Sequence, residues 1–243
     1  MTTCDVLAVG AHPDDVELTV GGTLLLAKEL GLKTAICHMT RGEAGTRGTP
    51  ETRASEAAAA AAALGVADLS ILGLADARLA VDDASIAAVV DVLRRLRPRV
   101  LLAPYIVDLH PDHEATGQIC RKAAFLAGVE RYAPGRPPWR PQAVYYYMSH
   151  TETEPRLIVD VTAQFERKIA AAKCYRSQFH VPESSEPRTY ISGPTFWHWW
   201  EGRHASWGNR IGVAYGEAFW IDGPIPARNP FTLFDGFGKY KNS

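Results

Sequence analysis

The sequence predicts an α/β fold in which a mostly parallel sheet carries helices on both faces. Short apolar runs alternate with helical segments of roughly 10 to 15 residues along the first half of the chain. The runs are bounded by glycine, proline or polar residues, as buried strands usually are. The 243 residues are 47% hydrophobic, which is enough for one sizeable core.

Local signals support the individual elements in chain order. The first helix ends at Gly31. Thr49 resembles an N-cap, and Pro50 takes the first position of the second helix, which closes at Gly65. A helical stripe of apolar residues then ends before Pro98. The expected strands are 6–9, 33–39, 68–72, 99–103, 143–148 and 156–161, and the expected helices are 20–30, 50–64, 85–96, 164–175 and one that opens at 111.

We expect one domain over residues 1–243. Residues 1–127 carry the alternation of strands and helices and predict a Rossmann-like core. The pattern is looser in residues 128–243, which predict strands, a helix and an aromatic-rich portion packed on that core.

Composition and charge exclude several classes of partner. The net charge is −1 and basic residues are spread along the chain, so neither nucleic acid nor an anionic membrane is expected. We also expect a cytoplasmic protein, because the first residues lack the pattern of a signal peptide and no apolar run has membrane-spanning length. The four cysteines form no C-x-x-C pair, so buried reduced thiols are favoured.

A cluster of polar side chains follows the first predicted strand. His12, Asp14 and Asp15 come directly after the apolar run and its closing Gly10. Imidazole and carboxylate bind zinc, and a second carboxylate can address a bound water. Alone, this cluster is more simply interpreted as a polar loop whose aspartates cap the next helix. A dinucleotide site is disfavoured because the glycine spacing is not G-x-G-x-x-G.

A second cluster, His110-Pro111-Asp112-His113, follows the strand at 99–103 and opens another helix. Loops after parallel strands meet at one edge of a sheet, where ligands bind. This expected convergence, rather than either cluster alone, predicts a metal site.

The segment 40–49 also follows a strand and includes Arg41 and Glu43. Its length suits a loop that lines a pocket, although a surface loop fits as well. Arg53 lies one turn inside the next helix, where it could hold an anionic substrate group or pair with Glu56 at i+3.

The stretch 195–200 contains three tryptophans in six residues. Packing in the core or at a subunit interface is the simpler interpretation, because tryptophan anchors such surfaces. A pocket wall or lid is the alternative.

Five blocks of the sequence resemble the zinc-dependent N-acetylglucosaminyl deacetylases of the PIG-L, or LmbE-like, family. They are residues 11–15, 40–49, 110–113, 175–179 and 211–219. The resemblance runs through almost the whole chain and is closest to the bacillithiol-biosynthesis branch, which deacetylates N-acetylglucosaminyl malate.

This resemblance implies roles for particular residues. His12, Asp15 and His113 would hold zinc, and Asp14 would be the general base. A protonated His110 would stabilise the tetrahedral intermediate. Further implied residues are Asp112, which would fix His110 and raise its pKa or simply stabilise the helix start, and Arg53, Arg41 and Glu43, which would contact the substrate.

Some features stay open. The branch often has an arginine before the second cluster, where this chain has Leu109, so the identity of the aglycone stays open. Two histidines and a carboxylate also suit Fe²⁺. Related enzymes are often hexamers, so a homo-oligomer is expected.

Three function classes therefore remain to be weighed. The leading hypothesis is deacetylation of an N-acetylglucosaminide: the malate, the inositol-linked sugar or a chitooligosaccharide. Another hydrolase, such as a phosphoesterase, would need a pair of metals and more carboxylates. A non-catalytic sugar- or zinc-binding protein would keep the ligands but would not need Asp14.

Overall fold

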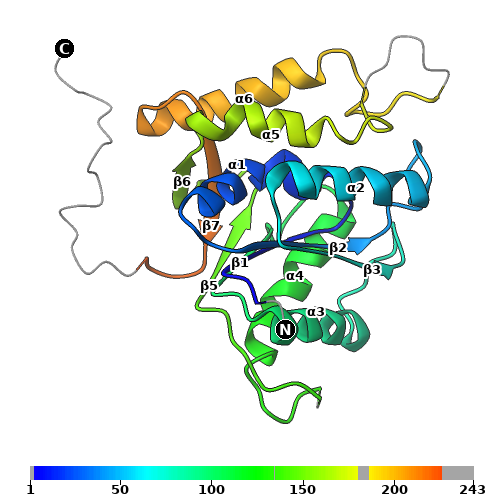
Figure 1. The fold of residues 1–243 in the computed structure, drawn as a ribbon, viewed down its shortest axis with the longest axis vertical. Helices are drawn as coiled ribbons and strands as arrows, with labels where there is room; N and C mark the ends of the chain where they lie inside the picture. Colours follow the sequence, from blue (N-terminus) through cyan, green and yellow to red (C-terminus); the bar gives the residue numbers. More distant parts are fainter. Residues whose placement is uncertain (1–2, 134, 180–185, 226–243) are drawn as a thin grey trace.

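A computed structural model describes residues 3–133, 135–179 and 186–225. The elements alternate as the sequence predicts over the first half (Figure 1). In chain order they are β1 (Val6–Gly10), α1 (Asp15–Glu29), β2 (Thr34–Thr40), α2 (Pro50–Leu64), β3 (Asp68–Leu74), α3 (Asp83–Leu96), β4 (Val100–Pro104), α4 (Pro111–Leu126), β5 (Ala143–Tyr147), β6 (Leu157–Asp160), the 3₁₀ turn η1 (Thr162–Gln164), α5 (Phe165–Ala172), α6 (Phe196–Ile211) and β7 (Gly216–Ile221).

The strands form one sheet in the order β3-β2-β1-β4-β5-β7-β6. The first five in this order are parallel, and β7 pairs antiparallel with both β5 and β6. The predicted fold class, a mostly parallel α/β sheet, is therefore confirmed. After β1 the chain adds β2 and β3 on one side of β1, and it then crosses to the other side to add β4. The direction in which strands are added therefore reverses between β1 and β4. Such a switch point is where open α/β sheets bind ligands.

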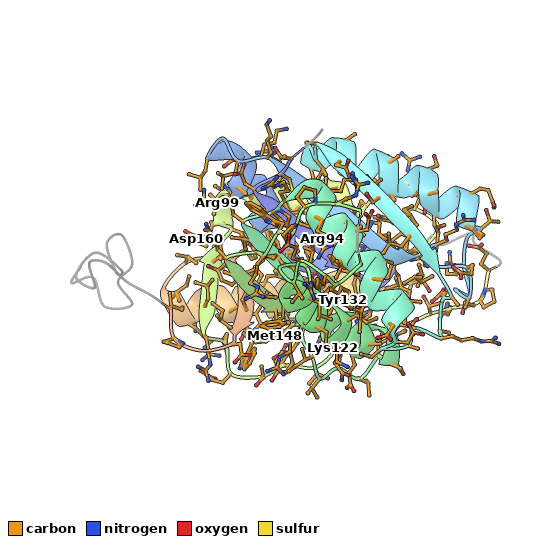
Figure 2. All side chains as sticks on the ribbon, turned by 90° about the horizontal axis from the view of Figure 1, so that it is seen from below. Arg94, Arg99, Lys122, Tyr132, Met148 and Asp160 are labelled. Carbon is orange, nitrogen blue, oxygen red and sulfur yellow. The ribbon has the colours of Figure 1, made fainter. Side chains whose placement is uncertain are left out.

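Helices cover both faces of the sheet. In Figure 1, α1, α2, α5 and α6 lie on one side and α3 and α4 on the other. Strand β1 is buried throughout, and its side chains alternate between the two cores: Leu7 and Val9 face α3 and α4, whereas Val6 and Ala8 face α1. Figure 2 shows the α3–α4 side from below, with Arg94 among its side chains. Arg94 donates to carbonyls of the segment that follows α4, including that of Ala127 at 3.0 Å and that of Val129 at 2.7 Å.

Helix α1 begins at Asp15, five residues earlier than the sequence predicts. It continues through a glycine pair because the backbone there lies against neighbouring elements. A Cβ on Gly22 would lie 2.8 Å from Cβ of Val161 and 2.9 Å from a carboxylate oxygen of Glu217. Glycine is therefore kept in a helix interior, where it is normally unfavourable, for close packing.

The second half departs further from the sequence-based expectation. The predicted helix at 164–175 is shorter, because η1 precedes it and α5 ends at Ala172. The stretch around 195–200 opens a sixteen-residue helix, α6, and the family-like block at 211–219 leads into β7. Within the described ranges, no helix is both long enough and apolar enough to cross a bilayer.

Candidate metal and catalytic site

The loop between β1 and α1 is held rigidly at the end of the sheet. Thr40, the last residue of β2, donates its backbone N–H and its hydroxyl to the carbonyl of Ala11, each at 3.0 Å. Asp14 then adopts φ 109° and ψ −27°, a left-handed region that is unusual for a residue other than glycine. This turn starts α1 at once, so Asp14 and Asp15 project from a fixed backbone.

Arg53, from the first turn of α2, locks this strained turn. Its buried guanidinium lies 3.2 Å from Oδ2 of Asp14 and also donates to the carbonyls of Pro13 and, at 3.3 Å, Gly42. Gly42 must be glycine, because a Cβ there would lie 2.1 Å from the guanidinium. The expected pair of Arg53 with Glu56 is not formed, whereas a substrate contact of Arg53 stays a prediction. Its donors point to the loop, and Glu56 instead accepts from Ser177.

The two predicted clusters converge as expected, because β1 and β4 are neighbours. Nε2 of His113 lies 3.1 Å from Oδ1 of Asp15, and Nδ1 of His12 lies 3.6 Å from Oδ2 of Asp15. Ligand atoms of these three residues all lie within 4.8 Å of one another. Two imidazole nitrogens and a carboxylate form a donor set that suits a divalent cation such as zinc.

Carboxylates face the outer nitrogens of both imidazoles. Nε2 of His12 lies 3.0 Å from Asp76 and 3.2 Å from Asp112, and Nδ1 of His113 lies 3.5 Å from Asp108. Metal-binding histidines usually have such partners, which fix the ring proton on the outer nitrogen and leave the inner lone pair for the metal. The donor set therefore fits a cation bound between His12, Asp15 and His113.

Burial shapes the acid–base properties of the two aspartates. Burial raises the pKa of Asp14 to about 6, although the charge of Arg53 opposes this shift. Burial would also raise the pKa of Asp15, but His113 and His12 hold it well below its usual value. Adjacent carboxylates thus have divergent pKa values, which is typical of sites that separate a base from a ligand.

His110 differs from the prediction in two respects. Burial and the positive charges of His113 and His12 lower the pKa of His110 overall, because they outweigh Asp112, which raises it as expected. Its Nδ1 accepts the backbone N–H of Asp112 at 3.2 Å, while the Asp112 carboxylate turns toward His12. Because Nδ1 is an acceptor here, the ring proton of neutral His110 lies on Nε2.

These residues line a cavity of about 190 Å³ that has an aromatic wall. The polar side holds His12, Asp14, Asp15, His110 and His113. A second group of lining residues comes mainly from α6 and the segment before it, and its aromatic members, called the aromatic wall, are Tyr190, Phe196, Trp199, Trp200 and Trp207. The tryptophan-rich stretch is therefore part core and part pocket wall, since Trp200 is also buried against Phe165.

Arg41 and Glu43 do not line this cavity in the part of the chain that the structure describes. The carboxylate of Glu43 accepts the backbone N–H of Arg41 at 3.1 Å and that of Asp76 at 2.9 Å. Glu43 thus supports the loop that carries Asp76 instead of contacting the cavity.

Sequence reasoning missed Asp76, Asp108 and His150. His150 follows β5, lines the cavity and stacks on His113 with 5.2 Å between ring centroids. The rule that located the two clusters, polar residues after a parallel strand, would have found it if applied to the predicted strand at 143–148. Asp76 and Asp108 stand alone in loops, and no local pattern distinguishes them from ordinary turn residues.

Comparisons with known proteins identify related sequences and a related structure. The family described as GlcNAc-PI de-N-acetylase (PIG-L) matches residues 7–124, which include both clusters. The structure of the conserved protein TT1542 from Thermus thermophilus superposes with a TM-score of 0.85 at 37% identity, covering 94% of this chain and 99% of that one.

Curated relatives are more distant and carry different names. The diacetylchitobiose deacetylase of Thermococcus kodakarensis is 28% identical, over 72% of this chain and 70% of the relative. A probable N-acetyl-α-D-glucosaminyl L-malate deacetylase 2 of Bacillus cereus is 28% identical, over 71% and 83%. A protein of Pseudomonas putida named 4-oxalmesaconate hydratase is 27% identical, over 73% and 75%.

Proposed function

Because the chain belongs to the PIG-L, or LmbE-like, family of deacetylases and is an amide hydrolase, we propose that it removes acetate from an N-acetylglucosaminyl conjugate. The observation that carries this proposal is the position of Asp14. It is a buried carboxylate with a raised pKa, it lies beside three metal-type ligands, and it lines the same cavity. A protein that only bound zinc or sugar would not need it.

His12, Asp15 and His113 are the proposed ligands of a divalent cation, zinc or iron(II). When bound, such a cation acts as a Lewis acid that acidifies water and polarises an amide carbonyl. The contacts of the outer ring nitrogens support this role, because they leave Nδ1 of His12 and Nε2 of His113 directed toward Asp15.

Asp14 is the proposed general base. A pKa of about 6 leaves its carboxylate ionised at neutral pH and still basic enough to take a proton from the attacking water. Arg53 fixes the orientation of this carboxylate through the contact at 3.2 Å and keeps it from turning away. Once the C–N bond breaks, the same carboxyl group can return the proton to the departing amine.

His110 is the proposed donor to the oxyanion, and it can act in its neutral form. The Asp112 backbone N–H occupies Nδ1, so the Nε2–H remains available at the cavity wall. A donor that is oriented before the reaction stabilises the developing charge without needing to be protonated. This assignment replaces the protonated His110 that the sequence led us to expect.

N-acetylglucosaminyl malate is the specific substrate that the resemblance and two curated relatives favour. In the described residues that line the cavity, Arg203 is the side chain with a permanent positive charge. It already contacts the carbonyl of Ser149 and, at 2.8 Å, the carboxylate of Glu152. The aromatic wall favours a second candidate, a neutral glycoside such as a chitooligosaccharide, because aromatic rings pack against apolar faces.

The test is acetate release by the metal-loaded enzyme from the malate, the inositol-linked and the chitobiose forms of N-acetylglucosamine. Asp14→Asn should lower kcat on the accepted substrate by about 10²- to 10⁴-fold, the usual contribution of a general base. Asp91→Asn is the matched control, because Asp91 is exposed on α3 and pairs there with Arg136.

The comparison of substrates identifies the aglycone, and the variants test the chemistry. Release of acetate from none of the three, with Asp14→Asn indistinguishable from the parent in metal content and ligand binding, would argue for a binding protein. Hydration of 4-oxalmesaconate without any deacetylation would instead point to the activity for which the Pseudomonas relative is named.

A further inference from the structure

The outer nitrogen of His12 faces two carboxylates at once. Nε2 lies 3.0 Å from Oδ1 of Asp76 and 3.2 Å from Oδ2 of Asp112. Both carboxylates are nearly buried, with side-chain exposures of 6% and 2%. We propose that Asp76 and Asp112 are a pair of positioning residues that hold His12 so that its Nδ1 binds the catalytic cation. This inference rests on the proposed function, although its test measures metal binding and not turnover.

Asp76 is fixed by the loop that follows β2. Its Oδ2 accepts the backbone N–H of Ala44 at 2.8 Å, and its own backbone N–H donates to Glu43 at 2.9 Å. One oxygen is therefore engaged by the loop, and the other is left for His12. Glu43 does not line the cavity, but it helps to position the metal site indirectly, because it binds the backbone of Asp76.

Asp112 is fixed by the loop that follows β3. Its Oδ2 accepts the backbone N–H of Ala77 at 2.7 Å, and its Oδ1 accepts that of Leu79 at 3.2 Å. Ala77 has a positive φ of 60°, which turns its N–H toward Asp112. The β3 loop therefore supplies Asp76 directly and holds Asp112 in place, so loops after four strands determine the orientation of one imidazole.

Two acceptors around one N–H set both the tautomer and the tilt of the ring. A neutral imidazole has one N–H and one lone pair, so a proton on Nε2 leaves the lone pair on Nδ1. Carboxylate acceptors also make the ring a better electron donor to a metal. Because each carboxylate has its own backbone anchors, loss of one should weaken the arrangement without removing it.

His12, Asp76 and Asp112 could themselves be regarded as a second metal site, since their ligand atoms also lie within 4.8 Å of one another. That arrangement needs the lone pair of His12 on Nε2. The first site needs it on Nδ1, and a neutral imidazole cannot provide both. One cation per chain is therefore expected, with Asp76 and Asp112 outside its coordination sphere.

The experiment is a competition between the protein and a chromophoric chelator for Zn²⁺, with the metal content of each protein measured in parallel. Asp76→Asn should weaken Zn²⁺ binding by about 10- to 100-fold, the range found when outer partners of metal ligands are removed. The double variant with Asp112→Asn should bind more weakly than either single variant. Parent and variants should bind at most one Zn²⁺ per chain.

Asp82→Asn is the matched control. It removes the same charge six residues from Asp76, but Asp82 caps α3 through Ser85 at 2.8 Å, which asparagine can also do. This variant should bind Zn²⁺ like the parent. Thermal melting of the metal-free proteins shows whether Asp112→Asn folds. If Asp112→Asn does not fold, Zn²⁺ binding by Asp76→Asn alone tests the proposal.

Two results would overturn the proposal. In the first, Asp76→Asn binds Zn²⁺ as tightly as Asp82→Asn does. In the second, the parent binds two Zn²⁺ and Asp76→Asn binds one, which would make the pair ligands of a second metal. Neither result bears on Asp14, so a failed positioning role is distinguishable from a failed deacetylase proposal.

Discussion

Two buried polar clusters include residues of α1 or of the loop before it, and they differ in how their charges balance. The strand-end cluster consists of His12, Asp14, Asp15, Arg53, Asp76, Asp108, Asp112 and His113. The interhelix cluster consists of Lys168, His204, Glu217, Thr19 and Thr23.

The interhelix cluster is internally saturated. The ammonium of Lys168 has three N–H groups, and they reach Glu217 at 2.6 Å, Nε2 of His204 at 2.7 Å and the carbonyl of Thr19 at 3.0 Å. The other carboxylate oxygen of Glu217 accepts from Thr23 at 2.5 and 2.7 Å. One positive and one negative charge cancel, so this cluster ties α1, α5, α6 and β7 together.

The strand-end cluster has five carboxylates and one permanent cation, Arg53. The imbalance is sustained by protonation of the histidines or by a bound metal, because unpaired buried charges are costly. The comparison teaches that burial and hydrogen bonding alone do not mark a functional site. A functional site is marked instead by an excess of carboxylates and imidazole lone pairs around one point.

The largest expected effect is on the strand-end cluster. His113→Ala removes one of three proposed ligands, so metal content and deacetylation should both fall by about 10³-fold or more, beyond the loss expected for an outer partner. The thermal transition of the metal-free protein should change little by comparison. His198→Ala, at an exposed position of α6, is the control. A His113→Ala enzyme that kept its metal and its activity would contradict the assignment of His113 as a metal ligand.

The interhelix cluster should respond in stability instead. Lys168→Met leaves the carboxylate of Glu217 buried and unpaired, which should cost about 3–5 kcal/mol of unfolding free energy. Adding Glu217→Gln should recover part of this loss, because the amide oxygen can still accept from α1. Urea denaturation measures the unfolding free energies of the single and the double variant. The kcat of the folded fraction should stay near the parental value. Equal stability of Lys168→Met and the parent would contradict the stabilising role of the interhelix cluster.

Glu17 provides a pH-dependent test between the two clusters. Burial raises its pKa from 4.5 to about 8, although a hydrogen bond from Tyr175 at 3.0 Å opposes the shift. Between these values the folded protein holds a proton that the unfolded chain releases. Stability should therefore fall as pH rises, by up to roughly 1.4 kcal/mol per unit. Glu17→Gln should flatten this slope in urea denaturation of the metal-free protein; an unchanged slope would show that Glu17 ionises normally.

The smallest expected effect concerns the aromatic wall, which joins the two clusters. Trp199 lines the cavity but remains 46% exposed. Trp199→Ala should raise KM by up to about 10-fold and leave kcat nearly unchanged, because it removes binding surface and not a reacting group. Steady-state kinetics with His198→Ala as the neighbouring control would test this. A fall in kcat alone would place Trp199 closer to the chemistry.

Much of the strand-end cluster could be predicted because its signals are local. His12 and His113 each follow an apolar run that forms a buried parallel strand, and β1 and β4 are neighbours in the sheet. The fold class followed from the same alternation. Helix α6 and strand β7 were not predicted, because their apolar residues pack against several elements and leave no single periodic stripe.

The sequence by itself determined which residue types stand at the ends of the strands and therefore the class of chemistry. Only the tertiary structure decided what those residues contact. Arg53 binds Asp14 and not Glu56, and Asp112 turns to His12, one hundred positions away, instead of His110. The physical reason is that strand and helix periodicity arises from neighbouring residues, whereas a hydrogen-bond partner is chosen by distances of about 3 Å between loops that meet only after the sheet has formed.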